Sequence, residues 1–243
     1  MRQLMIRTGE MLRDRRFLKK ALMIACPVAL QGMLNTVVNM VDTLMIGGLG
    51  SSAIAAVGLA NKYFFVFSLL VFGIVSGAGI LAAQYWGNGD VKSIRKVLGL
   101  SILLAAAGAL VFVLPGLIWP HQVMRIFTTS ESSIELGIKY LRIAVLTYPF
   151  IAMTNVYVAM LRAVNKVVYP VVCSCIAIAI NVVLNYVLIF GKLGAPAMGV
   201  AGAACATLIA RCIELILVLG YVYGKKLALA CGPRGMFGWS KSF

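Results

Sequence analysis

Six long apolar stretches, separated by short polar connections, leave few folds open to this chain. Hydrophobic residues make up 62% of its 243 residues and charged residues only 12%, whereas soluble domains are about half apolar and a quarter charged. A helix of about 20 apolar residues crosses a bilayer, and each stretch is at least that long. The expected helices cover residues 21–46, 53–84, 95–118, 134–161, 168–190 and 198–223. The sequence therefore predicts an all-α polytopic membrane protein, a bundle of six transmembrane helices.

The basic residues predict how this bundle is oriented. The formal net charge is +15, and most Lys and Arg residues lie in the N-terminal arm, the second and fourth connections and the tail. The positive-inside rule places such segments in the cytoplasm, so both termini should be cytoplasmic. We expect a basic arm at 1–20, a transmembrane lobe at 21–224 and a cytoplasmic tail at 225–243. Because the charge follows membrane topology, membrane lipid is the expected partner and nucleic acid is not.

A stripe of polar residues runs along the first predicted helix. Gln31, Asn35, Asn39 and Asp42 fall within an arc of about 80° when each residue turns the helix by about 100°. The rest of the stretch is almost entirely apolar, and a carboxylate that faces lipid is costly. These side chains should therefore face protein or water, which is typical of an ion or substrate path.

Polar residues of two further helices come out at a similar depth. Asn181 and Asn185 in the fifth helix and Thr207 in the sixth lie roughly 8–14 Å from the outer end, and Asp42 lies near that depth, at ~1.5 Å per residue. A carboxylate, two amides and a hydroxyl supply the oxygen ligands that a hard cation such as Na⁺ prefers, and the carboxylate could bind a proton instead. Alternatively, the amides only hydrogen-bond neighbouring helices, and Asp42 is solvated at the headgroups.

Other charged residues within the apolar stretches have simpler interpretations. Arg211 and Glu214 are three residues apart on the face of Thr207, a spacing that predicts an intrahelical salt bridge. Lys62 has no acidic residue one turn away, and the sequence assigns it no role. The small residues at 199–206 predict close packing between helices. Since no His, Cys or acidic cluster has catalytic spacing, we expect neither an enzyme nor a cofactor.

Four motifs are spread along nearly the whole chain: Pro27-x3-Gln31-x3-Asn35-x3-Asn39-x2-Asp42, Ala82 to Asp90 (AAQYWGNGD), Ile180 to Tyr186 (INVVLNY) and Gly199 to Thr207 (GVAGAACAT). Together they resemble motifs of one transporter family, the multidrug and toxic compound extrusion (MATE) family. The motifs occur in the family's order.

This resemblance implies a secondary transporter that expels organic, often cationic, compounds in exchange for Na⁺ or H⁺. It implies a cation site at Asp42, Asn181, Asn185 and Thr207. It implies a substrate cavity lined by Gln31, Asn35, Asn39 and Asn155. It also implies that the first helix bends at Pro27. Some members of the family have Asp where this chain has Asn185, and a missing carboxylate would weaken a Na⁺ site.

The length of the chain departs from that family. Its members have twelve helices in two six-helix lobes, whereas this chain holds one lobe, and residues 237–243 resemble the linker into the second. A second lobe is therefore an expected partner, because alternating access rocks one lobe on the other. Two alternatives remain: a lipid or oligosaccharide-lipid flippase of the same superfamily, and a half-transporter that is inactive alone.

Overall fold

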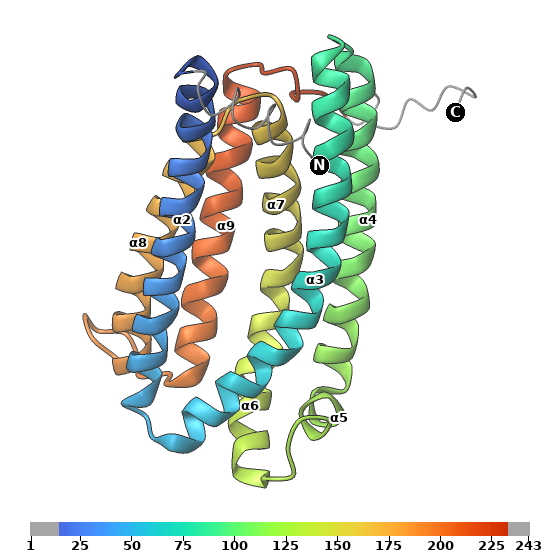
Figure 1. Cartoon of the computed structure of the whole chain (residues 1–243). Coiled ribbons are helices and arrows are strands. Elements are labelled where there is room, and N and C mark those ends of the chain that lie inside the picture. Colours follow the sequence, from blue (N-terminus) through green and yellow to red (C-terminus); the bar gives the residue numbers. More distant parts are fainter. Residues whose placement is uncertain (1–14, 233–243) are drawn as a thin grey trace, which may run out of the picture.

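The computed structural model describes residues 15–232, except for some side chains in the first part of α2, and every regular element in this range is helical. The long helices pack side by side as a bundle (Figure 1). In chain order the elements are α2 (Arg15–Gly47), α3 (Ser51–Gly87), α4 (Val91–Ile118), α5 (Pro120–Arg125), α6 (Glu131–Ala144), the 3-10 turn η1 (Val145–Thr147), α7 (Tyr148–Ala163), α8 (Val168–Phe190) and α9 (Val200–Gly224). The predicted all-α membrane fold is confirmed.

Five spans among the described residues are long and apolar enough to cross a membrane: α3, α4, α6 with α7, α8 and α9. The first predicted span corresponds to α2, whose 33 residues run along the bundle beside α8 (Figure 1). The described part of this helix includes Arg15 and the following residues of the expected basic arm. The first residues of α2, the last of α9 and the α3–α4 connection lie at one end of the bundle (Figure 1). The basic connections lie at this end of the bundle. Its location on the cytoplasmic side stays a prediction.

The fourth predicted span is not one uninterrupted helix. Its α-helical hydrogen bonding stops at α6 and resumes in α7, with η1 between them. Pro149 lies at the start of α7 and has no N–H to donate to the preceding turn. The hydroxyl of Thr147 donates instead to the carbonyl of Ala144 at 2.6 Å. The break places two polar side chains of this segment, Tyr140 and Thr147, beside the cavity described below.

The connection between α3 and α4 supplies the side chain that caps the start of α4. Gly89 has a φ of 73°, a left-handed conformation that glycine adopts at little cost. Asp90 then caps α4 by accepting from the backbone N–H of Ser93 at 3.1 Å and from its hydroxyl at 2.5 Å. These hydrogen bonds hold the pKa of Asp90 below its usual range. The short connection predicted between the second and third helices is therefore present.

The backbones of α8 and α9 approach closely at Gly202. A Cβ atom at Gly202 would lie 2.5 Å from the carbonyl oxygen of Leu188, so only glycine allows this approach. Gly191 ends α8 with a φ of 66° and begins the tight return to α9. The close packing predicted for residues 199–206 is confirmed, and it sets the relative depth of the polar residues on the two helices.

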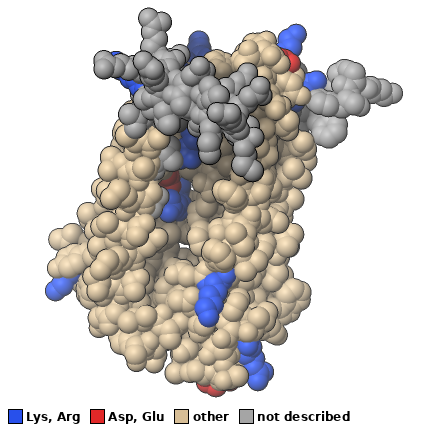
Figure 2. Space-filling view, viewed as in Figure 1, with Lys and Arg blue, Asp and Glu red and all other residues tan. Residues whose placement is uncertain are grey.

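A second packing centre joins α3, α4 and the α6–α7 span. The rings of Phe67 and Tyr148 stack at 4.4 Å between centroids. The hydroxyl of Tyr63 donates to the carbonyl of Phe112 at 2.7 Å. Figure 2 shows a hollow in the bundle, between a group formed by α2, α8 and α9 and a group formed by α3, α4, α6 and α7, and few charged side chains on the face in view. Large apolar side chains such as Phe72, which is 69% exposed, face outward and suit lipid or another protein surface.

Candidate functional site

A chain of hydrogen bonds joins α2, α8 and α9 at the four residues predicted for the cation site. The side-chain amide of Asn185 donates to Oδ1 of Asp42 at 2.6 Å and to Oδ1 of Asn181 at 3.2 Å. The amide of Asn181 donates to Oγ1 of Thr207 at 3.4 Å, and Thr207 donates to the carbonyl of Ala203 at 3.0 Å. The structure therefore brings together the residues that were predicted to converge.

These residues differ in solvent exposure. Asn185 is only 1% exposed and Asn181 is 7% exposed, whereas Asp42 and Thr207 are half-buried. Oδ1 of Asn185 is buried and accepts no hydrogen bond from any described residue. A buried acceptor without a partner costs about 1–3 kcal/mol. The cluster thus contains a buried carbonyl oxygen that accepts no hydrogen bond from a described donor.

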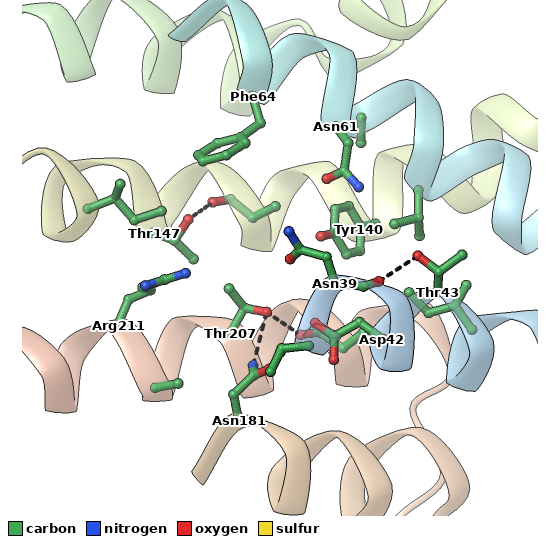
Figure 3. A pocket seen from close by; sticks show the side chains of 18 of the residues that line it. Asn39, Asp42, Thr43, Asn61, Phe64, Tyr140, Thr147, Asn181, Thr207 and Arg211 are labelled. Carbon is green, nitrogen blue, oxygen red and sulfur yellow. Dashed lines mark hydrogen bonds between the residues drawn. The ribbon is translucent and has the colours of Figure 1, made fainter. Parts of the chain in front are cut away.

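A cavity of about 380 Å³ opens beside this cluster between the two groups of helices. Asn39, Asp42, Asn181 and Thr207 lie along it, with Arg211 one turn further along α9 (Figure 3). The opposite wall is built from α3 and the α6–α7 span, and its polar or aromatic residues are Asn61, Phe64, Phe65, Ser68, Tyr140, Thr147 and Tyr148. The sequence predictions did not include this wall, although Asn61, Phe64, Phe65 and Ser68 have the spacing of a single face of α3.

The other predicted cavity residues lie elsewhere or outside the described side chains. Gln31 is not among the lining residues: its amide donates to Oγ of Ser174 at 2.6 Å, and its Oε1 accepts from Arg162 at 3.1 Å. Asn155 is exposed on α7 and does not line the cavity. The side chains of Asn35 and Pro27 are outside the described residues.

A second polar network lies on α8 and α9, one to two turns from Thr207. Arg211 Nη1 pairs with Oε2 of Glu214 at 2.7 Å, which confirms the predicted intrahelical salt bridge. Oε1 of Glu214 accepts from the hydroxyl of Ser174 at 2.6 Å. Glu214 is only 3% exposed, so it is a buried carboxylate with two donors. Lys62 is exposed on α3.

The MatE family model matches residues 27–187, two thirds of the chain, including the polar stripe of α2 and both asparagines of α8. The chain belongs to the MatE family. The predicted family membership is thereby confirmed, and the protein is a multi-pass protein of the cell membrane.

Curated relatives agree with this assignment. The probable multidrug resistance protein NorM of Thermotoga maritima is 30% identical over 210 residues, which is 86% of this chain and 45% of that protein. The probable multidrug resistance protein NorM of Synechocystis is 31% identical over 234 residues, which is 93% of this chain and 48% of that protein. The chain therefore spans about half the length of the curated relatives that it matches.

Solved structures show the same fold. A multidrug resistance MATE family transporter of the MOP superfamily, in an outward-facing conformation, superposes with a TM-score of 0.82 at 24% identity, over 92% of this chain and 49% of that one. A MOP superfamily transporter from Pyrococcus furiosus gives a TM-score of 0.82 at 24% identity, over 92% and 48%. These chains are about twice as long as this MatE chain, which corresponds to one half of each.

Proposed function

We propose that this chain is one lobe of a cation-coupled antiporter that exports organic, often cationic, compounds in exchange for Na⁺ or H⁺. The observation that carries the proposal is the hydrogen-bonded cluster of Asp42, Asn181, Asn185 and Thr207, which lies beside the cavity. The relatives named above are described as probable multidrug resistance proteins, which supports drugs or toxins as the exported class.

The oxygen atoms of the cluster suit the proposed coupling ion. A carboxylate of Asp42, the free carbonyl oxygen of Asn185 and the hydroxyl of Thr207 are ligands that a hard cation prefers. A proton bound to Asp42 would neutralise the negative charge of this carboxylate without needing the oxygen atoms of Asn185 and Thr207. Because the cluster holds one carboxylate rather than two, both ions remain open as the driving species.

Coupling requires that the ion and the exported compound favour different states of the transporter. If cation binding at Asp42 stabilises one state and the compound stabilises the other, each lowers the apparent affinity for the other by the same factor. In two-lobe transporters these states differ by rocking of the lobes around a central site. We therefore propose that a second six-helix lobe, in the same or another chain, completes the transporter.

Efflux of ethidium from membrane vesicles tests this proposal. With a second lobe present, an imposed Na⁺ or H⁺ gradient should drive efflux, and Asp42→Asn should reduce it about tenfold or more while insertion is unchanged. Asp42→Asn keeps the side-chain size and one oxygen, so it removes the charge alone. This chain without a partner should insert and export nothing.

Two results would contradict the proposal. Efflux by Asp42→Asn at the wild-type rate would show that the carboxylate does not couple the ion. A lack of efflux in both arrangements would instead favour the flippase or the inactive half.

A further inference from the structure

Arg211 is the positively charged residue among the described residues that line the cavity, and Asp42 is the negatively charged one. Arg211 lies on α9 four residues after Thr207 and three before Glu214, so the three side chains share one helix face. Its side chain is 38% exposed, whereas that of its partner Glu214 is 4% exposed. The guanidinium is therefore held at Glu214 but is open towards the cavity.

The second partner of Glu214 does not depend on Arg211. The hydroxyl of Ser174 donates to Oε1 at 2.6 Å, and Ser174 itself accepts from the amide of Gln31 at 2.6 Å. Removing one partner from a buried ion pair is strongly destabilising when the other charge is left bare. Here the carboxylate of Glu214 would keep its hydrogen bond from Ser174 on α8. Losing the guanidinium of Arg211 is therefore less costly than in an isolated ion pair.

Asp42 lines the same cavity as this guanidinium. Within the described residues, Asn185 provides its one side-chain hydrogen bond, to Oδ1. One helical turn, about 6 Å, separates Arg211 from Thr207 along α9, and an extended arginine side chain covers a similar length. Figure 3 shows Arg211 and Asp42 on either side of Thr207 along one cavity.

We propose that Arg211 is an internal counter-cation that exchanges between the two carboxylates. It pairs with Glu214 while Na⁺ or a proton occupies Asp42, and it turns to Asp42 when that cation leaves. When the cation has left, Arg211 is the one positive charge for both carboxylates, and Glu214 keeps the hydroxyl of Ser174 as its hydrogen-bond donor. The exchange avoids an uncompensated charge at Asp42 in the emptied state, which would be costly in a membrane interior. The coupling ion in this scheme rests on the function proposed above, but the reach of Arg211 to Asp42 does not.

The alternative is a salt bridge that only stabilises α9. The two can be separated by melting temperatures of the purified chain in nanodiscs, because these require neither transport nor a known ion. Asp42→Asn is introduced into three backgrounds: wild type, Glu214→Gln, and the double variant Arg211→Gln with Glu214→Gln. The amide at position 42 can still accept from Asn185, so only the charge is lost.

Exchange predicts a specific pattern of melting temperatures. In the wild-type background Asp42→Asn should shift Tm by no more than about 2 °C, since Arg211 stays with Glu214. In the Glu214→Gln background the guanidinium depends on Asp42, so Asp42→Asn should lower Tm by about 5 °C or more. In the double-variant background the effect should again be small. Equal shifts in all three backgrounds would overturn the proposal.

Efflux by the transporter completed with its second lobe gives a second readout. Glu214→Gln should reduce ion-driven efflux about tenfold, because Arg211 then occupies Asp42 permanently and competes with the ion. Adding Arg211→Gln should restore efflux, since it removes the competitor. A salt bridge that is only structural predicts no rescue, and absence of rescue with an active wild type would also overturn the proposal. A wild type without ion-driven efflux would count against the proposed function, while the Tm series would still decide the exchange.

Discussion

At the scale of single residues, Asn185 decides how the candidate cation site is built. Its amide group bridges Asp42 on α2 and Asn181 on α8, and its carbonyl oxygen is buried with no hydrogen bond from the described residues. A carboxylate at this position would place a second negative charge next to Asp42. Since hard cations bind more tightly as the number of charged ligands rises, this residue should influence the choice between Na⁺ and H⁺.

Asn185→Asp tests that influence. We expect the Na⁺ concentration that gives half-maximal efflux to fall about tenfold, because a second carboxylate strengthens the site for a hard cation. The measurement is ethidium efflux against Na⁺ concentration at constant pH, with the second lobe present. Gln122→Glu adds the same charge on an exposed position of α5 and should leave the curve unchanged. An unchanged curve for Asn185→Asp would place the coupling site elsewhere.

At the scale of helices, the contact between α8 and α9 holds the site in register. Asn181 and Asn185 lie on one helix and Thr207 on the other, and the tight return at Gly191 fixes the depth at which they face each other. The backbones approach closely at Gly202, where any side chain would meet the carbonyl of Leu188. The geometry of the polar cluster thus depends on a residue that has no polar side chain.

Gly202→Ala should therefore destabilise the chain. We expect a loss of about 1–3 kcal/mol from overpacking, measured by thermal or denaturant unfolding in detergent. Gly220→Ala is the matched control on the same helix, because a Cβ there meets nothing within 4 Å. That variant should be neutral or gain up to about 1 kcal/mol of helix propensity. Equal stability of the two variants would show that α8 can move away from α9 without cost.

At the scale of the whole molecule, the described residues form one half of the fold seen in the solved relatives. The aligned chains are about twice as long, and this chain covers 48–49% of them. The cavity is bounded by the two groups of helices of this half. The apolar outer surface of this half must contact lipid on some sides and, in the proposed transporter, a second lobe on another side.

The predicted orientation can be tested with single cysteines. In a background without the six native cysteines, Lys192→Cys should react with a membrane-impermeant maleimide added outside intact cells. Lys166→Cys should react only after the cells are opened, because the positive-inside rule places its connection in the cytoplasm. Both positions lie in connections between helices, so neither should disturb packing. The reverse labelling pattern would invert the topology.

The sequence by itself determined the properties that depend on neighbouring residues along the chain. The length of each apolar run predicted the membrane helices, the spacing of polar residues predicted the face of α2 that carries Asp42, and the spacing of Arg211 and Glu214 predicted their salt bridge. Each follows from local helical geometry.

Only the tertiary structure decided which helices touch. It paired Asp42 with Asn185, 143 residues away, bound Gln31 to Ser174 rather than leaving it in the cavity, and brought Asn61 and Tyr140 to the opposite wall. Such contacts depend on how helices pack and tilt against one another, because helix ends such as Gly191 and close approaches such as Gly202 set the register between elements.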